Sequence, residues 1–220
     1  MRKTEFAIGE YYHIYNRGVD KRTIFECRDD YKRFLLGMKE FNRLDAIGSL
    51  YEKYLREKKI GGSGGSASIM EAEPPRLVDV ICFCVNQNHY HFILKQNEEK
   101  GIEKFMQKLG TSYTMFYNNK YSRSGILFQG KYKAIHINTN EYLLLLSAYV
   151  NMNHQIHGYP EKDWPYSSLL DYTGKRDGKL CEKEAVLGQF DNNFEQYEKY
   201  LNDNAEYFRE KKGLEKYILE

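Results

Sequence analysis

The sequence lacks any apolar run approaching the roughly 20 residues that are needed to span a bilayer. The first residues, 1–6, are not followed by an apolar stretch with a small-residue cleavage site, so no signal peptide is predicted. At 220 residues and 41% hydrophobic content, the chain is long enough for one buried core with appendages. We therefore expect a cytoplasmic protein with no membrane partner.

Charge of one sign is also lacking, because 33 basic residues stand against 31 acidic ones. With a formal charge of only +2, any contact with nucleic acid has to come from local basic clusters. Cysteine is scarce, and the four cysteines form neither a paired Cys-x-x-Cys zinc framework nor a disulfide scaffold. Cys82 and Cys84, two apart on an expected strand, are predicted to point inward as small hydrophobic residues.

Tyrosine, by contrast, is abundant, with 20 residues against 12 phenylalanines and one tryptophan. Tyrosine suits half-wet surfaces, where the ring stacks and the hydroxyl meets water or phosphate. Sheets are rich in tyrosine as well, so the count alone supports no function.

Hydrophobic periodicity predicts alternating strands and helices. Apolar residues at three- and four-residue spacing indicate helices, and alternating or continuous apolar runs indicate strands. The predicted order, β-α-β-β-α-β-α, is typical of an α+β protein with a ferredoxin-like split βαβ antiparallel sheet, helices on one face and one additional helix. The strands are expected at 11–16, 77–85, 89–95 and 131–138, and the helices at 29–44, at 101–117, from 139 to near 158, and twice within 192–215.

Two features refine this plan. Asp29 or Asp30 is a plausible cap for the first helix, and Thr139 for the last helix of the sheet domain. A Gly/Ser-rich stretch, 61–68, is closed by two prolines and is expected to be a flexible excursion over about 59–75, within one domain. We expect that domain to cover 1–170, followed by a helical extension over 171–220.

His89 and His91 lie two apart on a predicted strand. A period of two sends both side chains to the same face, where two imidazoles could share one cation. A His-x-His pair also occurs by chance on solvated strands, so the pair needs further support before a metal role follows.

Tyr149 and Asn153 supply that support, because a spacing of four places both on one face of a helix. The amide oxygen of Asn153 is a hard ligand suited to Mg²⁺ or Mn²⁺, and imidazole suits Mn²⁺ and related metals. Such an ion could polarise a scissile phosphate, and the hydroxyl of Tyr149 could attack the phosphorus and form a phosphotyrosine link. The sequence therefore predicts nucleophilic cleavage of a phosphodiester.

These pieces together resemble the single-tyrosine, IS200-like transposases of the His-hydrophobic-His nuclease superfamily, and most closely the branch associated with repetitive extragenic palindromes (REP). The resemblance covers roughly 11–170 without the Gly/Ser excursion. It implies that His89, His91 and Asn153 bind the metal ion and that Tyr149 is the nucleophile. It also implies a substrate of single-stranded DNA, often beside a hairpin, and a 5′-phosphotyrosine intermediate with a free 3′-hydroxyl. The matching stretches are 12–18 (YHIYNRG), 88–94 (NHYHFIL), 127–134 (LFQGKYKA) and 149–153 (YVNMN).

The chain departs from the family pattern at two positions. Gln87 stands where the family often has proline, which can alter the turn but not the ligands. Asn153 stands where the better-studied dimeric members carry glutamine, so both a monomer and a homodimer remain open. A further block, 164–168, resembles a family segment that is expected to pack the tyrosine helix onto the body.

Basic residues interleaved with tyrosines are expected to contact DNA. Arginine and lysine neutralise phosphates, and tyrosine rings stack on unpaired bases. His13 is expected to be near the site but structural, and His154 to point away from it. The candidate DNA-binding residues are Arg17, Lys21, Arg22, Arg123, Gln129, Lys131, Tyr132 and Lys133.

Two other functions remain possible from the sequence. Ferredoxin-like sheets with exposed aromatic residues also serve as non-catalytic modules that bind single-stranded nucleic acid, although the Lys/Arg-Gly-Phe/Tyr-Gly/Ala-Phe block of that module is lacking. A metal-dependent hydrolase could instead use His89 and His91 with an activated water, leaving Tyr149 as a packing residue.

Overall fold

The computed structural model describes residues 4–45, 48, 50, 52, 55, 58, 74–159 and 161–210. The expected Gly/Ser excursion therefore lies outside the described residues, except for its last two positions, Pro74 and Pro75. Residues 211–215, the end of the last predicted helix, lie outside them too.

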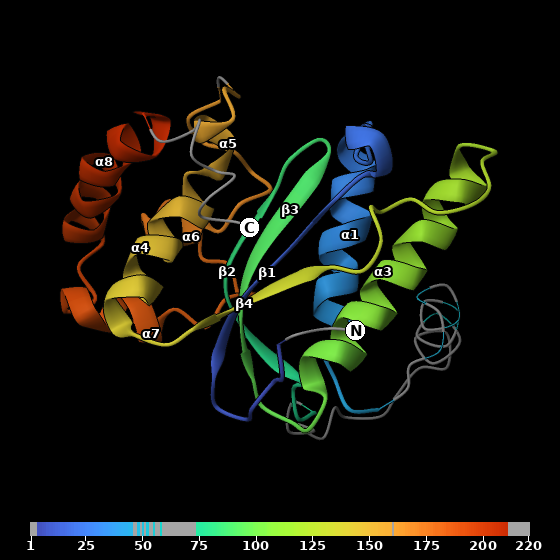
Figure 1. Ribbon diagram of the computed structural model, residues 1–220, viewed down its shortest axis with the longest axis horizontal. Helices are drawn as coiled ribbons and strands as arrows, with labels where there is room; N and C mark the ends of the chain where they lie inside the picture. The colour runs from blue at the N-terminus through green and yellow to red at the C-terminus, as the bar shows by residue number, and fades with distance from the viewer. Residues whose placement is uncertain are drawn as a thin grey trace.

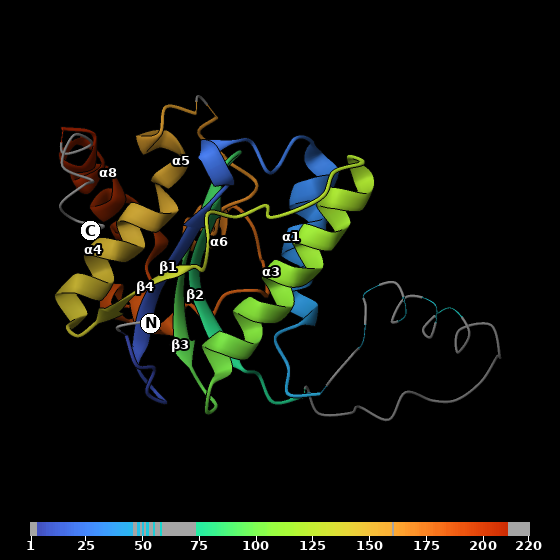
Figure 2. The same cartoon turned by 45° about the vertical axis from the view of Figure 1, so that its right-hand side comes forward.

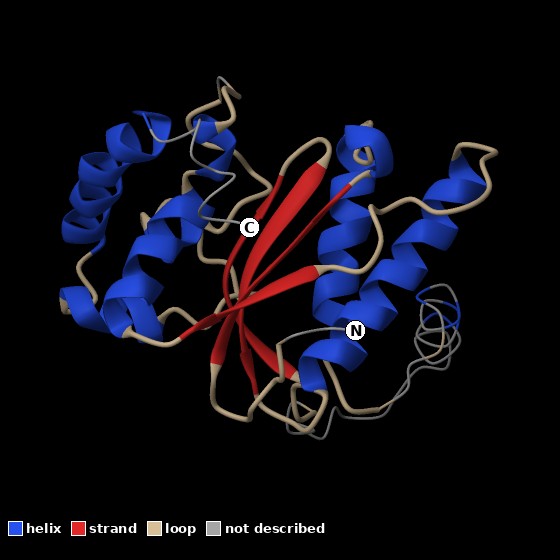
Figure 3. Ribbon diagram, viewed as in Figure 1, coloured by secondary structure: helices blue, strands red, loops and turns tan. Residues whose placement is uncertain are grey.

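A four-stranded antiparallel sheet forms the centre of the fold (Figures 1 and 3). The strand order is β2-β3-β1-β4, which confirms the predicted ferredoxin-like split βαβ plan. The two middle strands, β3 and β1, are the ones that the sequence predicted to carry His89 and His13. The strands are β1 (Tyr11–Arg17), β2 (Val78–Val85), β3 (His89–Gln96) and β4 (Lys133–Ile137).

Helices cover both faces of this sheet, as Figure 2 shows. The two helices of the ferredoxin-like core, α1 (Arg28–Glu40) and α3 (Gly101–Lys120), pack on one face. The additional helix and the C-terminal helices pack on the other. They are α4 (Asn140–Asn151), α5 (Asn153–Ile156), α6 (Leu169–Tyr172), α7 (Glu184–Leu187) and α8 (Phe194–Glu210). Two 3-10 turns are also present, η1 (Val19–Lys21) and η2 (Gly188–Phe190).

The two-residue period of β3 separates the two packing layers. Tyr90 and Phe92 face the first pair of helices, where their rings lie 5.4 Å and 6.1 Å from the ring of Phe34 on α1. The intervening His91 faces α4 instead, with its ring 5.5 Å from that of Tyr149. The alternation in the sequence thus sets one face of β3 aside for packing and turns the other toward the tyrosine helix.

The start of α1 differs from the prediction. The N-cap is Cys27, not Asp29 or Asp30. Asp30 lies at the third helical position, and its carboxylate accepts hydrogen bonds from the backbone N–H groups of Glu26 at 2.8 Å and Cys27 at 3.2 Å. An acidic residue at this position closes a capping box, which sequence spacing alone does not distinguish from a cap.

The helix predicted from Thr139 to near Gly158 is broken in the structure. Thr139 caps it as expected, because its hydroxyl accepts a hydrogen bond from the backbone of Tyr142 at 3.1 Å. At Met152 (φ −92°, ψ 3°) the backbone leaves helical geometry, so α4 ends and the short α5 begins. The end of the segment near Gly158 (φ 82°) is as predicted, since glycine adopts this left-handed conformation without strain.

The C-terminal segment contains more short elements than predicted. The short helices α6 and α7 precede a single long helix, α8, which spans most of the region expected to hold two helices. The amphipathic pattern of α8 buries Tyr197, Leu201, Ala205 and Phe208. Across the described residues, no helix combines the length and the apolar content that a bilayer crossing requires.

Candidate metal and tyrosine site

A row of paired residues crosses the sheet on the face that α4 covers. Cys84 on β2 pairs with His91 on β3, His91 with Tyr15 on β1, and Tyr15 with Lys133 on β4. Two pairs further along, Arg17 lies opposite His89. Both histidines therefore lie on one face with two cationic side chains beside them.

Hydrogen bonds fix the orientation of His89. The side chain of Asn88 donates from Nδ2 to the backbone oxygen of Lys21 at 3.0 Å, so its Oδ1 is the atom that faces His89. The Nδ1–H of His89 donates to that oxygen at 2.6 Å. Burial, reinforced by the charge of the His157 ring, lowers the pKa of His89 to about 3. The ring is therefore neutral at physiological pH, with its lone pair on Nε2.

Asn153 approaches that lone pair from α5. Its Oδ1 lies 3.0 Å from Nε2 of His89, and both atoms are acceptors. Two ligands at 2.0–2.1 Å from one octahedral ion and at right angles to each other are separated by about 3 Å. The spacing of this nitrogen and this oxygen therefore fits two adjacent ligands of one hard divalent ion.

His91 is deeper than His89, only 4% exposed, and contacts a second buried histidine. Its Nδ1 lies 2.9 Å from Nε2 of His13. Burial, with smaller contributions from His13 and His89, lowers the pKa of His91 far below the ordinary value. Burial also lowers the pKa of His13 to about 3. All three rings are therefore neutral, the form in which imidazole binds metals.

Tyr149 packs over this histidine cluster from α4. Its ring meets the ring of His91 edge-on, with centroids 5.5 Å apart at 87°, and lies 6.2 Å from His13. On its other side the ring lies 5.5 Å from Phe208 of α8, and the side chain is 7% exposed. The structure thus brings Tyr149 and Asn153 together over the two predicted histidines, although the phenol is covered.

The donor set fits a divalent metal ion only if the amide is included. No group of three or more His, Cys, Asp or Glu side chains suited to a metal occurs in the part of the chain that the structure describes. His89, His91 and Asn153 instead offer two imidazoles and one amide oxygen. This mixed nitrogen and oxygen set is compatible with Mn²⁺ and, through the oxygen, with Mg²⁺.

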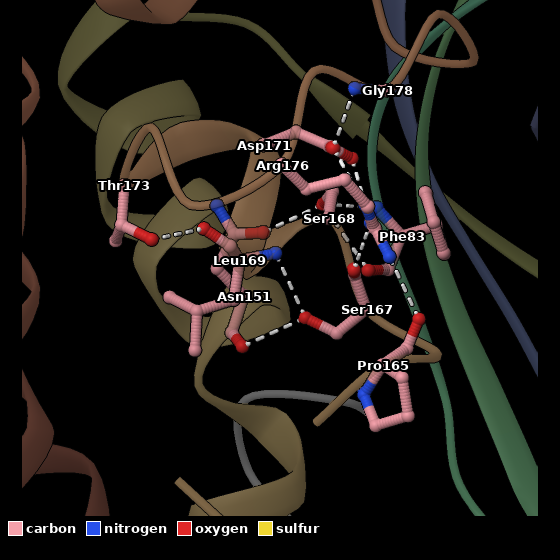
Figure 4. A network of polar contacts seen from close by, with 10 residues as sticks. All are labelled: Phe83, Asn151, Pro165, Ser167, Ser168, Leu169, Asp171, Thr173, Arg176 and Gly178. Atoms are coloured by element: carbon pink, nitrogen blue, oxygen red, sulfur yellow. Dashed lines mark hydrogen bonds and ion pairs between the residues drawn. The ribbon is translucent and has the colours of Figure 1, made fainter. Parts of the chain in front are cut away.

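A network of buried polar groups holds α4 in place (Figure 4). Oγ of Ser168 donates to Oδ1 of Asn151 at 2.6 Å, and Oγ of Ser167 donates to the Asn151 backbone oxygen at 3.3 Å. Nε1 of Trp164 donates to the backbone oxygen of Val85 at 2.9 Å. The segment 164–168 therefore ties the tyrosine helix to β2, as expected from the sequence.

A buried ion pair stabilises that segment from outside. Arg176 pairs with Asp171, with Nε 2.7 Å from Oδ1, and its Nη2 donates to the backbone oxygen of Ser167 at 2.6 Å. Asp171 is 1% exposed, and both of its carboxylate oxygens accept hydrogen bonds from this guanidinium. The tyrosine helix thus packs against a segment that is held by hydrogen bonds and an ion pair.

Some of the predicted DNA-binding residues gather beside the histidines. Arg17 lies opposite His89 and hydrogen-bonds to Gln129, and Nζ of Lys133 lies 5.9 Å from the ring of Tyr15. Lys131 and Tyr132 precede Lys133, with Lys131 exposed and Tyr132 half-buried. These residues border one edge of the candidate site.

The remaining cationic residues lie further out. Lys21 is adjacent to the site through its backbone contact with Asn88. Arg22 binds the backbone oxygen of Val19 at 3.2 Å, with Asp20 3.6 Å away. The guanidinium of Arg123 holds its own loop, donating to Asn118 at 3.0 Å and to the Ile126 oxygen at 2.8 Å. Arg123 therefore stabilises a loop in addition to carrying charge.

Three residues join the site without having been proposed as part of it. His13 contacts His91, and the ring of His157 lies 4.5 Å from that of His89. Nδ2 of Asn86 lies within hydrogen-bond distance of both His89 and Asn153. The spacing of four between Asn153 and His157 was a usable signal, whereas nothing local in the sequence marks Asn86. His154 points away from the site as predicted, with its ring stacked 6.2 Å from Trp164.

Known proteins share both the sequence pattern and the fold. Residues 67–153, which contain the histidine pair, Tyr149 and Asn153, match the family described as "Transposase IS200 like". A solved structure of a REP-associated tyrosine transposase bound to a REP hairpin has a similar fold, with a TM-score of 0.52 and 11% sequence identity over 84% of this chain and 96% of that one. No curated protein sequence matches the chain. The family match confirms the resemblance to IS200-like transposases that was drawn from the sequence, and the solved structure confirms the fold.

Proposed function

Starting from a chain that carries the IS200-like transposase pattern, we propose a metal-dependent enzyme that nicks single-stranded DNA and can rejoin the strands. Tyr149 is the nucleophile, and His89, His91 and Asn153 hold the Mg²⁺ or Mn²⁺ ion. One observation carries the proposal: the ring of Tyr149 lies 5.5 Å from that of His91, in the same cluster where Oδ1 of Asn153 lies 3.0 Å from Nε2 of His89.

The reaction replaces one phosphodiester bond of the DNA with a bond between phosphorus and the side chain of Tyr149. The phenol oxygen of Tyr149 bonds to the phosphorus, the bond from phosphorus to the 3′ oxygen breaks, and the phenol proton ends on the leaving 3′ oxygen. The products are a 5′-phosphotyrosine and a free 3′-hydroxyl, which can attack the phosphotyrosine to rejoin strands. A divalent ion, when bound, polarises the phosphate and neutralises the charge that builds on its oxygens.

The protein's own residues bind and orient the DNA. Arg17 and Lys133 border the histidine cluster and neutralise backbone phosphates, while Tyr15 and Tyr132 offer rings for unpaired bases. Lys21, Arg22, Arg123, Gln129 and Lys131 extend this surface. A solved transposase of similar fold is described as bound to a REP hairpin, which supports hairpin DNA as the partner here.

The burial of Tyr149 sets a condition on this function. At 7% exposure and with the ring of Phe208 5.5 Å away, the phenol has to be uncovered before a phosphate can reach it. Phe208 lies in the last turn of α8, and helix ends open at a low free-energy cost. A shift of this turn is therefore part of the proposed cycle.

Covalent capture tests the proposal. Labelled single-stranded hairpin DNA is incubated with the full chain and Mn²⁺ and resolved on a denaturing gel. We expect a protein–DNA adduct that disappears in Tyr149→Phe and persists in Tyr142→Phe, a matched change on the same helix. Cleavage without an adduct would instead indicate a hydrolase, and binding without cleavage a non-catalytic module; either outcome overturns the proposal.

The metal ligands are tested separately from DNA binding. His89→Ala, His91→Ala and Asn153→Ala should each abolish the adduct while largely preserving the affinity for hairpin DNA. Chelation by EDTA should have the same effect on the wild-type chain. Wild-type adduct formation by Asn153→Ala would remove that residue from the site.

A further inference from the structure

Asn86 lies at the point where two proposed ligands meet. It occupies the turn between β2 and β3 and is fully buried. Its Nδ2 lies 2.7 Å from Oδ1 of Asn153 and 2.9 Å from Nε2 of His89, and these two atoms are 3.0 Å apart. Three polar atoms from three separate segments therefore form a compact triangle.

Hydrogen bonding alone does not satisfy this triangle. Oδ1 of Asn88 accepts the Nδ1–H of His89, so in a ring that carries one proton Nε2 is a bare acceptor. As the amides stand, the lone pairs of His89 and Asn153 face each other. If both amides are flipped, the oxygen of Asn86 faces the lone pair of His89 instead. Flipping one amide brings together either three acceptors or two donors. Every arrangement leaves at least one contact between two acceptors or two donors.

The geometry of the donor adds to this mismatch. The two N–H bonds of an amide diverge too widely to aim at two acceptors that are only 3.0 Å apart. In addition, Nδ2 of Asn153 is buried and has no hydrogen-bond partner among the described residues, so this amide gains nothing on its donor side. The oxygen of Asn153 is thus held in the triangle at a free-energy cost that hydrogen bonds do not offset.

A divalent cation removes the mismatch if Asn86 turns over. With its Oδ1 in the triangle, Asn86 presents a second amide oxygen beside the nitrogen of His89 and the oxygen of Asn153. Its Nδ2 then turns toward Sγ of Cys84, which now lies 3.5 Å from Oδ1. Three acceptors that would otherwise repel one another become three ligands around a cation.

We propose that Asn86 is an additional ligand of the divalent ion, and that its side-chain amide flips when the ion binds. This inference rests on the proposed metal site, and it adds an oxygen donor to the set of His89, His91 and Asn153. Without the ion, the amide of Asn86 holds His89 and Asn153 at the spacing that the ion requires.

Metal affinity, measured without DNA, tests this assignment. Mn²⁺ is titrated into the full chain by isothermal titration calorimetry for the wild type, Asn86→Ala, Asn86→Asp and Gln87→Ala, an exposed neighbour in the same turn. We expect Asn86→Ala to lower the Mn²⁺ affinity about tenfold or more, the scale of losses around metal sites. Asn86→Asp should raise the affinity about tenfold, because a carboxylate is a stronger hard ligand. Gln87→Ala should leave it unchanged.

The opposite results overturn the proposal. If Asn86 only competes with the ion, Asn86→Ala will bind Mn²⁺ as tightly as the wild type or more tightly. If it only donates to Asn153, Asn86→Asp will bind more weakly. The side-chain NH₂ signals of Asn86, followed by ¹H–¹⁵N NMR as Mg²⁺ is added to the wild-type chain, give a test that needs no variant; signals that stay fixed at saturating Mg²⁺ contradict the flip.

Failure of this inference is distinguishable from failure of the proposed function. If the wild type binds Mn²⁺ and His89→Ala does not, while Asn86→Ala does so normally, only the role of Asn86 is refuted. If the wild type forms the DNA adduct but both Asn86 variants bind Mn²⁺ with the same affinity as Gln87→Ala, the proposed enzymatic function is retained and the role of Asn86 as a ligand is refuted. A wild type that binds no Mn²⁺ overturns both.

Discussion

Nε2 of His13 lies 2.9 Å from Nδ1 of His91, and both rings are buried beneath Tyr149. When the Nδ1–H of His91 donates to His13, the remaining nitrogen of His91 carries a lone pair and can bind a metal ion. A second partner on the far nitrogen is the usual way in which proteins fix the tautomer of a metal-binding histidine. His13 is therefore expected to orient His91 and not to bind the ion itself.

Replacing His13 should weaken the site without removing a ligand. We expect His13→Ala to lower the Mn²⁺ affinity and the rate of adduct formation by roughly 10–100-fold, the range for partners of metal ligands. His13→Gln, which keeps an acceptor, should retain more of both. His136→Ala is the control, because His136 lies on the adjacent strand but bonds to Glu10 on the surface. Calorimetry and gel assays check this, and normal affinity in His13→Ala would refute the orienting role.

The cationic residues beside the histidines should act on DNA through its phosphates. Arg17→Ala and Lys133→Ala should each weaken binding to hairpin DNA and reduce the slope of log affinity against log salt by about 0.7 for each single-strand phosphate that the variant no longer neutralises. Lys95→Ala is a matched control, because Lys95 lies on β3 at the end away from the histidines. Fluorescence anisotropy at several salt concentrations measures the slope. An unchanged slope in both variants would exclude these residues from the phosphate-binding surface.

Sequence patterns predicted the sheet better than the helix ends. The side chains of β3 alternate between two faces of the sheet, and those of β2 are nearly all apolar, so a shift in register would expose apolar residues. Both strands therefore begin and end within one or two residues of the predicted bounds. The break at Met152 was not predictable in the same way, because no glycine or proline marks it. It coincides with tertiary contacts, since Asn151 is hydrogen-bonded to Ser167 and Ser168, and Oδ1 of Asn153 lies 3.0 Å from Nε2 of His89.

The candidate site shows the same division. His89, His91, Tyr149 and Asn153 were nominated from spacings of two and four, which are local rules. His13 and Asn86 enter through the strand register and through the hairpin turn, which only the folded chain defines. Phe208 reaches Tyr149 across 59 positions of sequence, a contact that no periodicity encodes.

The buried carboxylate of Asp30 should make stability depend on pH. Burial alone would raise its pKa, but hydrogen bonds from Lys120 at 2.6 Å, from Tyr121 at 2.8 Å and from the backbone outweigh it and lower the pKa below the ordinary value. Because the folded pKa lies below the unfolded one, the stabilisation is complete above about pH 4 and disappears as the pH falls through the folded pKa.

Asp30→Asn should therefore lower the free energy of unfolding by roughly 3 kcal/mol at pH 7, as expected for a broken buried ion pair. The difference from wild type should shrink below about pH 4. Urea denaturation between pH 3 and 8 measures it. Asp163→Asn, which breaks a surface pair with Lys175, should cost less than about 1 kcal/mol. A difference that stays constant down to pH 3 would contradict the assignment.

The cover over Tyr149 should control access to the phenol. Phe208→Ala removes the ring that lies 5.5 Å from Tyr149 in the last turn of α8, so it should expose the phenol. We expect severalfold faster nitration of Tyr149 by tetranitromethane, followed by peptide mass spectrometry. The adduct should also form faster if uncovering limits the reaction. Phe194→Ala, at the other end of α8, should change neither rate. Because Phe208→Ala keeps every proposed ligand and the nucleophile, slower adduct formation in a folded variant would mean that this ring positions Tyr149 instead of covering it.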